Sequence, residues 1–221
     1  KKRRQPRSFN VNITYIELKP NSTQILLEDV MSRIGFIGVG KMGNPMAHNL
    51  LKSGHSVKVF DLSKEAIESV VEKGALVANS PSDAAADVDF VITMLPTGKE
   101  VRDIFMSSEL LRKASHGTLF IDCSTIDVES SLTVHTTVKK AGFSMIDAPV
   151  SGGTVGAEKG TLTFMCGGQK EIFEKCREVF EVMGENVVHC GGPSQGQAVK
   201  ICNNMVAGTI FLATAEAFVL G

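Results

Sequence analysis

Short apolar runs alternate with amphipathic stretches over residues 32–150 of this 221-residue chain. The amphipathic stretches repeat their apolar positions every three to four residues, as surface helices do. Together the two patterns predict parallel strands joined by helices, which is a doubly wound α/β sheet. We expect strands at residues 33–37, 56–60, 74–77, 89–95, 118–122 and 143–149. We expect helices at residues 42–52, 63–73, 99–105 and 127–140, with another beginning at 80–83.

The pattern changes after residue 160. A strand at 161–166, a helix at 169–183 and a short strand at 186–190 complete the first domain, which we place at residues 32–193. A long helical pattern then runs over residues 197–220 with few polar positions, so this helix needs other residues to cover it. We interpret residues 194–221 as the start of a helical domain that is truncated in this chain.

Three glycines follow the first predicted strand and open the first predicted helix. Gly38, Gly40 and Gly43 have the spacing G-x-G-x-x-G, and Lys41 and Met42 lie between them. In a dinucleotide-binding fold the first glycine allows a tight turn, the second admits a pyrophosphate and the third packs the helix on its strand. Such a turn also occurs in ordinary α/β proteins. The strand before it and the helix after it favour a Rossmann-type cofactor site.

Asp61 ends the second predicted strand, eighteen residues beyond Gly43. A carboxylate at this place binds the adenosine ribose hydroxyls and repels the 2′-phosphate of NADP, so it favours NAD as the cofactor. The alternative is a turn or helix cap, because Leu62 and Ser63 follow directly and Ser63 suits an N-cap.

Two loops follow later strands at their carboxyl ends, where ligands lie in open α/β sheets. Leu95 and Pro96 end one strand, and Thr125 follows another. Their position makes them candidates for the cofactor side of a site. Ordinary loop residues would occupy the same positions just as readily.

Ser151, Gly152 and Gly153 leave the strand at 143–149, at the same edge of the predicted sheet. A hydroxyl and exposed backbone N–H groups can hold a substrate carboxylate. The same residues also suit a flexible turn between domains, and the two interpretations are compatible.

Lys200 and Asn204 are four residues apart on the long helix and therefore share one face. Lys200 has no acidic residue nearby in the sequence, which makes it a candidate for proton transfer. Taken alone, a lysine on a helix is more often a surface residue.

Composition restricts the partners of the chain. Hydrophobic residues make up 43% and charged residues 21%, so we expect a packed core. A net charge of -1 disfavours nucleic acid as a partner, and no apolar run is expected to approach the length needed to span a membrane. The five cysteines are odd in number and never form C-x-x-C, so we expect neither a disulfide framework nor a metal site.

The first 31 residues do not continue the α/β pattern. They begin with a basic cluster, and the first acidic residue is Glu17. This composition is compatible with a targeting segment, and a disordered extension is the alternative.

These motifs together resemble the β-hydroxyacid dehydrogenase family, and within it the branch that oxidises 3-hydroxyisobutyrate in valine breakdown. The resemblance extends over residues 32–221. It is carried by residues 35–47, 94–97, 121–127, 147–153, 160–165 and 196–205.

The resemblance implies a role for each candidate residue. Lys200 would be the catalytic lysine and Asn204 would orient the substrate. The substrate carboxylate would bind to Ser151, Gly152 and Gly153, and the nicotinamide side would be lined by Leu95, Pro96 and Thr125. The implied reaction is NAD-dependent oxidation of a 3-hydroxy acid to its semialdehyde, in a mitochondrial homo-oligomer. The alternatives are an NADPH-dependent glyoxylate or semialdehyde reductase of the same family and a non-catalytic nucleotide-binding protein.

Overall fold

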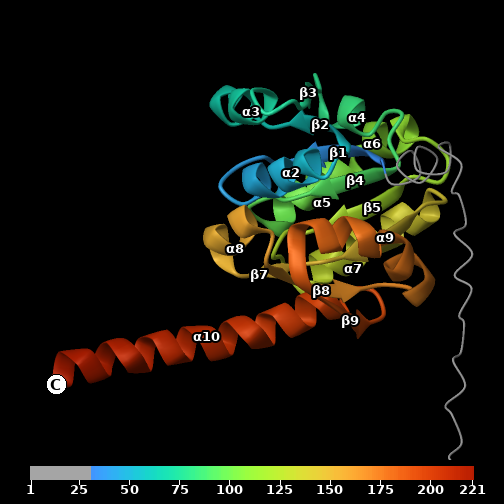
Figure 1. The fold of residues 1–221 in the computed structure, drawn as a ribbon. Helices are drawn as coiled ribbons and strands as arrows, with labels where there is room; N and C mark the ends of the chain where they lie inside the picture. Colours follow the sequence, from blue (N-terminus) through green and yellow to red (C-terminus); the bar gives the residue numbers. More distant parts are fainter. Residues whose placement is uncertain (1–30) are drawn as a thin grey trace, which may run out of the picture. The chain divides into compact units, whose positions relative to one another are not determined.

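The sheet is best described from its parallel part. The computed structural model describes residues 31–221, so the predicted N-terminal extension, apart from its last residue, lies outside the described residues. The parallel strands are β1 (Arg33–Ile37), β2 (Ser56–Phe60), β3 (Leu76–Val77), β4 (Phe90–Thr93), β5 (Leu119–Asp122) and β6 (Ser144–Asp147). Three further strands are β7 (Val150–Ser151), β8 (Leu162–Gly167) and β9 (Gly184–Gly191). Within residues 31–221 these strands form one sheet in the order β3-β2-β1-β4-β5-β6-β8-β7, with β9 paired to β8 (Figure 1).

Helices cover both faces of the sheet. One face carries α2 (Gly43–Lys52), α3 (Lys64–Val71), α8 (Gly153–Lys159) and α9 (Lys170–Met183). The other face carries α4 (Pro81–Ala84), α5 (Gly98–Met106), α6 (Ser108–Lys113) and α7 (Val128–Lys140). Neighbouring residues of β1 enter the two cores: Phe36 packs in the first and Ile37 in the second. The doubly wound, mainly parallel sheet predicted from the sequence is confirmed.

Some local predictions differ from the structure. The strands at 33–37 and 56–60 have the predicted bounds, and Ser63 and Asp127 cap their helices as expected. The sequence did not predict α6, β7 or α8. Helix α8 begins directly after Gly152, whose φ of 128° is a backbone conformation that glycine favours, and the glycine pair therefore suggested a turn only. Strand β8 runs antiparallel to β6 and β7, which closes the parallel part of the sheet.

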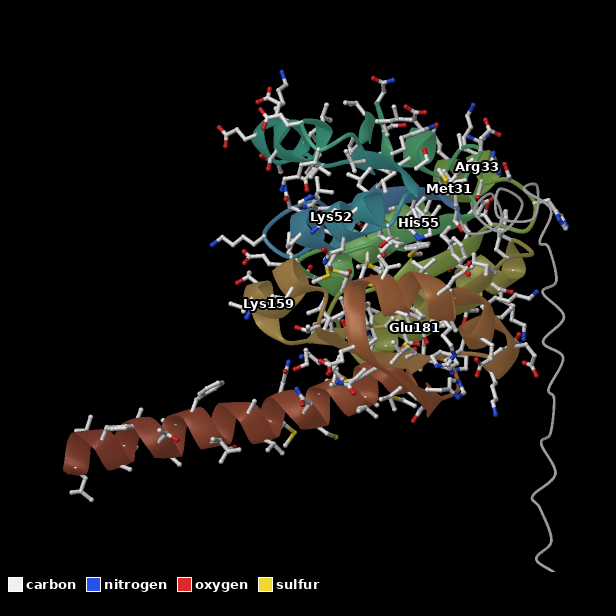
Figure 2. All side chains as sticks on the ribbon, viewed as in Figure 1. Met31, Arg33, Lys52, His55, Lys159 and Glu181 are labelled. Carbon is white, nitrogen blue, oxygen red and sulfur yellow. The ribbon has the colours of Figure 1, made fainter. Side chains whose placement is uncertain are left out.

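The last helix, α10 (Gln195–Leu220), is unlike the others because most of it lies away from the sheet (Figure 1). Its side chains project from all sides of the helix, as Figure 2 shows. Large apolar residues are exposed there, including Phe211 at 75% and Phe218 at 82%. The sequence predicts that the apolar residues of this helix need packing partners. Among the described residues, most of them have none.

Helix α10 is also long and apolar enough to cross a membrane, judged by length and composition alone. The prediction that no apolar run approaches such a length is wrong for this helix. Polar residues interrupt its apolar positions, but α10 contains only two charged residues, Lys200 and Glu216, which a membrane-span criterion tolerates. A core helix of a soluble protein can have the same length and composition. These two properties therefore do not show whether protein or a membrane surrounds α10.

Candidate functional site

The carboxyl ends of five parallel strands form one row across the sheet. Phe60 of β2 is in register with Ile37 of β1, and Ile37 is in register with Thr93 of β4. The row continues through Asp122 of β5 to Asp147 of β6. Ligands of open α/β folds bind outside this edge. The apolar half of the row borders the glycine turn, and the polar half leads to the start of α10.

The glycine turn is tightly packed except at one position. A Cβ on Gly38, whose φ is +95°, would lie 2.3 Å from the carbonyl oxygen of Met94. A Cβ on Gly43 would lie 1.9 Å from the carbonyl oxygen of Gly38, so α2 can approach β1 only through a glycine. A Cβ on Gly40 would meet no atom within 4 Å. The backbone of Gly40 therefore faces open space, as the approach of a pyrophosphate requires.

A cavity of about 700 Å³ lies over this turn, within the size range of cofactor and ligand sites. Eight of the nine residues proposed for the cofactor line it: Gly38, Gly40, Lys41, Met42, Gly43, Asp61, Leu95 and Pro96. The ninth, Thr125, does not line it and is exposed in the loop after β5. The cavity has the size for a dinucleotide, and it is lined by the backbone of the glycine turn and by the carboxylate of Asp61.

Asp61 makes hydrogen bonds within the turn and also lines the cavity. Its Oδ2 accepts a hydrogen bond from Val39 N at 2.8 Å, and its Oδ1 accepts one from Ser63 N at 2.9 Å. It therefore ties the glycine turn to the start of α3 and at the same time lines the cavity. A carboxylate oxygen can accept more than one hydrogen bond, so each oxygen of Asp61 can still accept a hydrogen bond from a ribose hydroxyl.

Asp122 is a buried acid at the end of β5, and the sequence pattern assigns it no chemical role. Its Oδ1 accepts hydrogen bonds from Thr93 Oγ1 at 2.8 Å and from Ser124 N at 3.1 Å. Its Oδ2 is buried and has no hydrogen-bond partner among residues 31–221. Burial raises the pKa of Asp122 from 3.8 to about 6, because the charged form loses its hydration.

This raised pKa predicts a pH-dependent loss of stability. The folded state favours neutral Asp122, so its stabilising contribution is complete below pH 3.8 and is lost as the pH rises through about 6. Between pH 4.5 and 7.5 we expect the free energy of unfolding to fall by about 2 kcal/mol more in the unsubstituted chain than in Asp122→Asn, which stays neutral. Urea unfolding at both pH values measures the difference. Parallel pH dependences would contradict it.

Asp147 caps the start of α10 from another element. The helix is preceded by Ser194, whose own side chain makes no cap, and Asp147 Oδ1 accepts from Ser194 N at 2.7 Å. Asp147 Oδ2 accepts from Gln197 N at 3.0 Å. His135 Nε2 lies 2.9 Å from Asp147 Oδ1 and shares this carboxylate. A buried acid is thus stabilised by the free N–H groups of a helix N-terminus.

The sequence missed this capping network. Asp122 and Asp147 each end an apolar strand, and that repeated pattern was the available signal. The adjacency of the two acids, however, depends on the strand register, which only the structure supplies. Gln197, to which the sequence pattern assigns no role of its own, is fully buried.

Lys200 lies one turn into α10 and is 7% exposed. Burial lowers the pKa of its ammonium group from 10.5. No ion pair or hydrogen bond offsets that burial within the described part of the chain. A buried lysine without a carboxylate partner loses its proton more easily than a surface lysine, which suits proton transfer. Asn204 follows on the same face and is exposed.

The candidate substrate residues follow β6, the strand that anchors α10, and lie at the end of β7 and the start of α8. Ser151 is half-buried four positions after Asp147, and Gly152 and Gly153 are exposed. Both glycines have positive φ, 128° and 62°, so their backbone N–H groups adopt directions that other residues rarely allow. The end of β6 therefore leads both to these residues and, through Asp147, to the helix of Lys200.

Comparison with known proteins finds a matching family model and several similar dehydrogenases. A family model for the NAD-binding domain of 6-phosphogluconate dehydrogenase matches residues 33–192. An NAD-dependent L-serine dehydrogenase of Pseudomonas aeruginosa is 46% identical over 86% of this chain and 64% of its own length. The mitochondrial 3-hydroxyisobutyrate dehydrogenase of Bos taurus is 44% identical over 85% of this chain and 56% of its own length.

A solved structure shows the same similarity in three dimensions. The Mycobacterium tuberculosis 3-hydroxyisobutyrate dehydrogenase, determined with L-serine, has a TM-score of 0.82 and 45% identity to this chain. The match covers 86% of this chain and 65% of that one. The chain thus spans less than two thirds of the length of each of these relatives.

Proposed function

We propose that this chain, which belongs to the β-hydroxyacid dehydrogenase family, supplies the NAD site and the catalytic lysine for oxidation of 3-hydroxyisobutyrate or a similar 3-hydroxy acid. Its NAD(P)-binding domain is the part that the family model matches. The observation that carries the proposal is the buried, unpaired Lys200, anchored by the first turn of its helix to the sheet edge that holds the cofactor cavity.

The chemistry divides between the cofactor and the residues of the chain. The chemistry that bound NAD would supply is a hydride acceptor for the carbon that carries the hydroxyl. Lys200 Nζ, in its neutral form, takes the hydroxyl proton as the carbonyl forms, and becomes an ammonium group. Ser151, Gly152 and Gly153 hold the substrate carboxylate, and Asn204 orients the hydroxyl. Fixing the carboxylate places the reacting carbon at one distance from the nicotinamide, which lowers the entropic part of the barrier.

The preference for NAD rests on Asp61. Its carboxylate lines the cavity and would lie against a 2′-phosphate, which repels like charge. We expect the unsubstituted chain to bind NADH at least ~10-fold more tightly than NADPH, and Asp61→Ser to remove most of that difference. Fluorescence titration with both cofactors measures it. Tighter binding of NADPH by the unsubstituted chain would instead favour the reductase alternative.

The substrate assignment has one close competitor. The relatives include both an L-serine dehydrogenase and 3-hydroxyisobutyrate dehydrogenases, and both substrates are 3-hydroxy acids with the same carboxylate-to-hydroxyl spacing. Comparing kcat/KM for 3-hydroxyisobutyrate and L-serine at saturating NAD decides between them, with the higher value expected for 3-hydroxyisobutyrate. Binding of NAD without turnover of either acid would favour the non-catalytic alternative.

The exposed apolar surface of α10 enters the proposal as a protein interface. We propose that further helices and a second copy cover it and complete the substrate side, as the family resemblance implies. The exposure of Phe211 and Phe218 and the greater length of the relatives support this. Sedimentation velocity tests it: a mass of more than one copy is expected, and a monomer at every concentration contradicts it.

The cellular setting follows from the relatives named mitochondrial, which come from Dictyostelium discoideum, Bos taurus and Mus musculus. Other relatives are bacterial. We propose a mitochondrial enzyme of valine breakdown. Imaging of the tagged protein in a eukaryotic cell tests the location, and a uniform cytosolic signal would contradict it.

A further inference from the structure

The side chain of Gln197 bridges the first turn of α10 and the loop that follows β5. Its Nε2 donates to the carbonyl oxygen of Ser124 at 2.7 Å, and its Oε1 accepts from Ile126 N at 3.0 Å. A backbone carbonyl can only accept and an N–H can only donate, so these two partners determine the orientation of the amide. The two contacts lie on either side of Thr125, which is exposed between two buried residues.

The backbone of Gln197 is anchored separately. Its N–H donates to Asp147 Oδ2 at 3.0 Å, and the other oxygen of that carboxylate receives Ser194 N at 2.7 Å. His135 holds Asp147 from α7. Gln197 is therefore fixed to β6 through its backbone and to the β5 loop through its side chain. Because all of these groups are buried, their hydrogen bonds are shielded from competing water.

These contacts connect the two halves of the candidate site. Lys200 follows Gln197 by three residues and lies on the same side of the helix. Thr125 projects from the loop that Gln197 holds. We infer that Gln197 is a positioning residue, which fixes the Thr125 loop to the helix of Lys200 and so keeps the nicotinamide and the lysine amine at one separation. This inference rests on the proposed function, in which Thr125 lies on the nicotinamide side.

Other contacts of the loop would remain if Gln197 were replaced. Ser124 Oγ accepts from Leu95 N at 2.9 Å, and Ser124 N donates to Asp122 Oδ1 at 3.1 Å. The loop would stay attached to the sheet while losing its attachment to α10. Replacement of Gln197 should therefore loosen the nicotinamide side locally and leave the glycine turn and the adenosine side intact.

The test compares Gln197→Met, which keeps the shape of the side chain without its hydrogen bonds, with Gln195→Met as a matched control. Gln195 is exposed in the same helical turn. NADH affinity reports both halves of the cofactor, whereas ADP-ribose affinity reports only the adenosine and pyrophosphate half. The chain has no tryptophan, so the emission of NADH can be followed directly.

For Gln197→Met we expect NADH affinity to fall about 10-fold, ADP-ribose affinity to stay within about twofold and kcat to fall about 10- to 100-fold. Gln195→Met should change none of these. Unchanged NADH affinity and kcat in Gln197→Met would overturn the inference, as would an equal loss of NADH and ADP-ribose affinity.

A second variant covers the case in which Gln197→Met does not fold. Gln197→Glu keeps the acceptor for Ile126 N and loses the donor to Ser124, so it should show the same selective loss of NADH affinity. Failure of the proposed function looks different: the unsubstituted chain would bind NADH and ADP-ribose without oxidising any 3-hydroxy acid, and the comparison of the two ligands would still decide the role of Gln197.

Discussion

Replacing Lys200 with alanine should lower turnover of a 3-hydroxy acid by about 10²–10⁴-fold, the usual contribution of a positioned acid or base, and leave NAD affinity almost unchanged. Lys200 is 7% exposed, and its pKa is lowered by burial, so a neutral amine forms at lower pH than for a surface lysine. The cofactor cavity does not include it. Loss of the amine therefore removes the proton acceptor without removing cofactor contacts.

Two controls sharpen this prediction. Lys200→Arg keeps the positive charge but cannot accept a proton, and should be nearly as inactive as the alanine variant. Lys170→Ala removes an exposed lysine of α9 and should keep full activity. Steady-state kinetics at several pH values should show kcat/KM rising with pH in the unsubstituted chain as Lys200 loses its proton. Unchanged turnover in Lys200→Ala would exclude the lysine as the base.

Replacing Gly40 with alanine should lower NAD affinity by about 10- to 100-fold and leave the melting temperature nearly unchanged. A Cβ at this position meets no protein atom within 4 Å, so the folded chain accommodates it. The new methyl group would instead occupy the space through which the pyrophosphate reaches the backbone N–H groups. Isothermal titration with NAD measures the loss.

Gly43→Ala provides the contrast. Its Cβ would lie 1.9 Å from the carbonyl oxygen of Gly38, so the turn must shift. We expect the melting temperature to fall by about 2–10 °C, as overpacking of a close contact does. Gly192→Ala, another position with open space, should change neither quantity. If Gly40→Ala and the unsubstituted chain bound NAD equally well, the glycine turn would not be part of the cofactor site.

Much of the sheet was predictable because its strands are short, apolar and bounded by glycine or acidic residues. The bounds of β1 and β2 follow directly from that pattern, and Gly38 and Asp61, which the sequence singled out together, line the same cavity. Periodicity failed where glycines begin a helix. Gly152 and Gly153 suggested a turn, whereas their positive φ angles lead into α8.

The buried polar network was beyond the reach of sequence patterns for another reason. Asp122 and Asp147 are 25 positions apart, and their adjacency comes from the register of β5 on β6. Gln197 interacts with Ser124 across 73 positions. Neither contact has a local signature, because the hydrogen bonds join elements that only the folded sheet brings together. The apolar surface of α10, by contrast, was visible in the sequence, and its exposure agrees with that pattern.

Transfer of deuterium from carbon 3 of 3-hydroxyisobutyrate to NAD tests the central claim most directly. The chain is incubated with NAD and the acid labelled at the carbon that carries the hydroxyl, and the reduced cofactor is analysed by mass spectrometry. We predict deuterium in the reduced cofactor, with Lys200→Ala transferring it about 10²–10⁴-fold more slowly. Saturable binding of NAD with the label remaining entirely in the hydroxy acid would contradict the account.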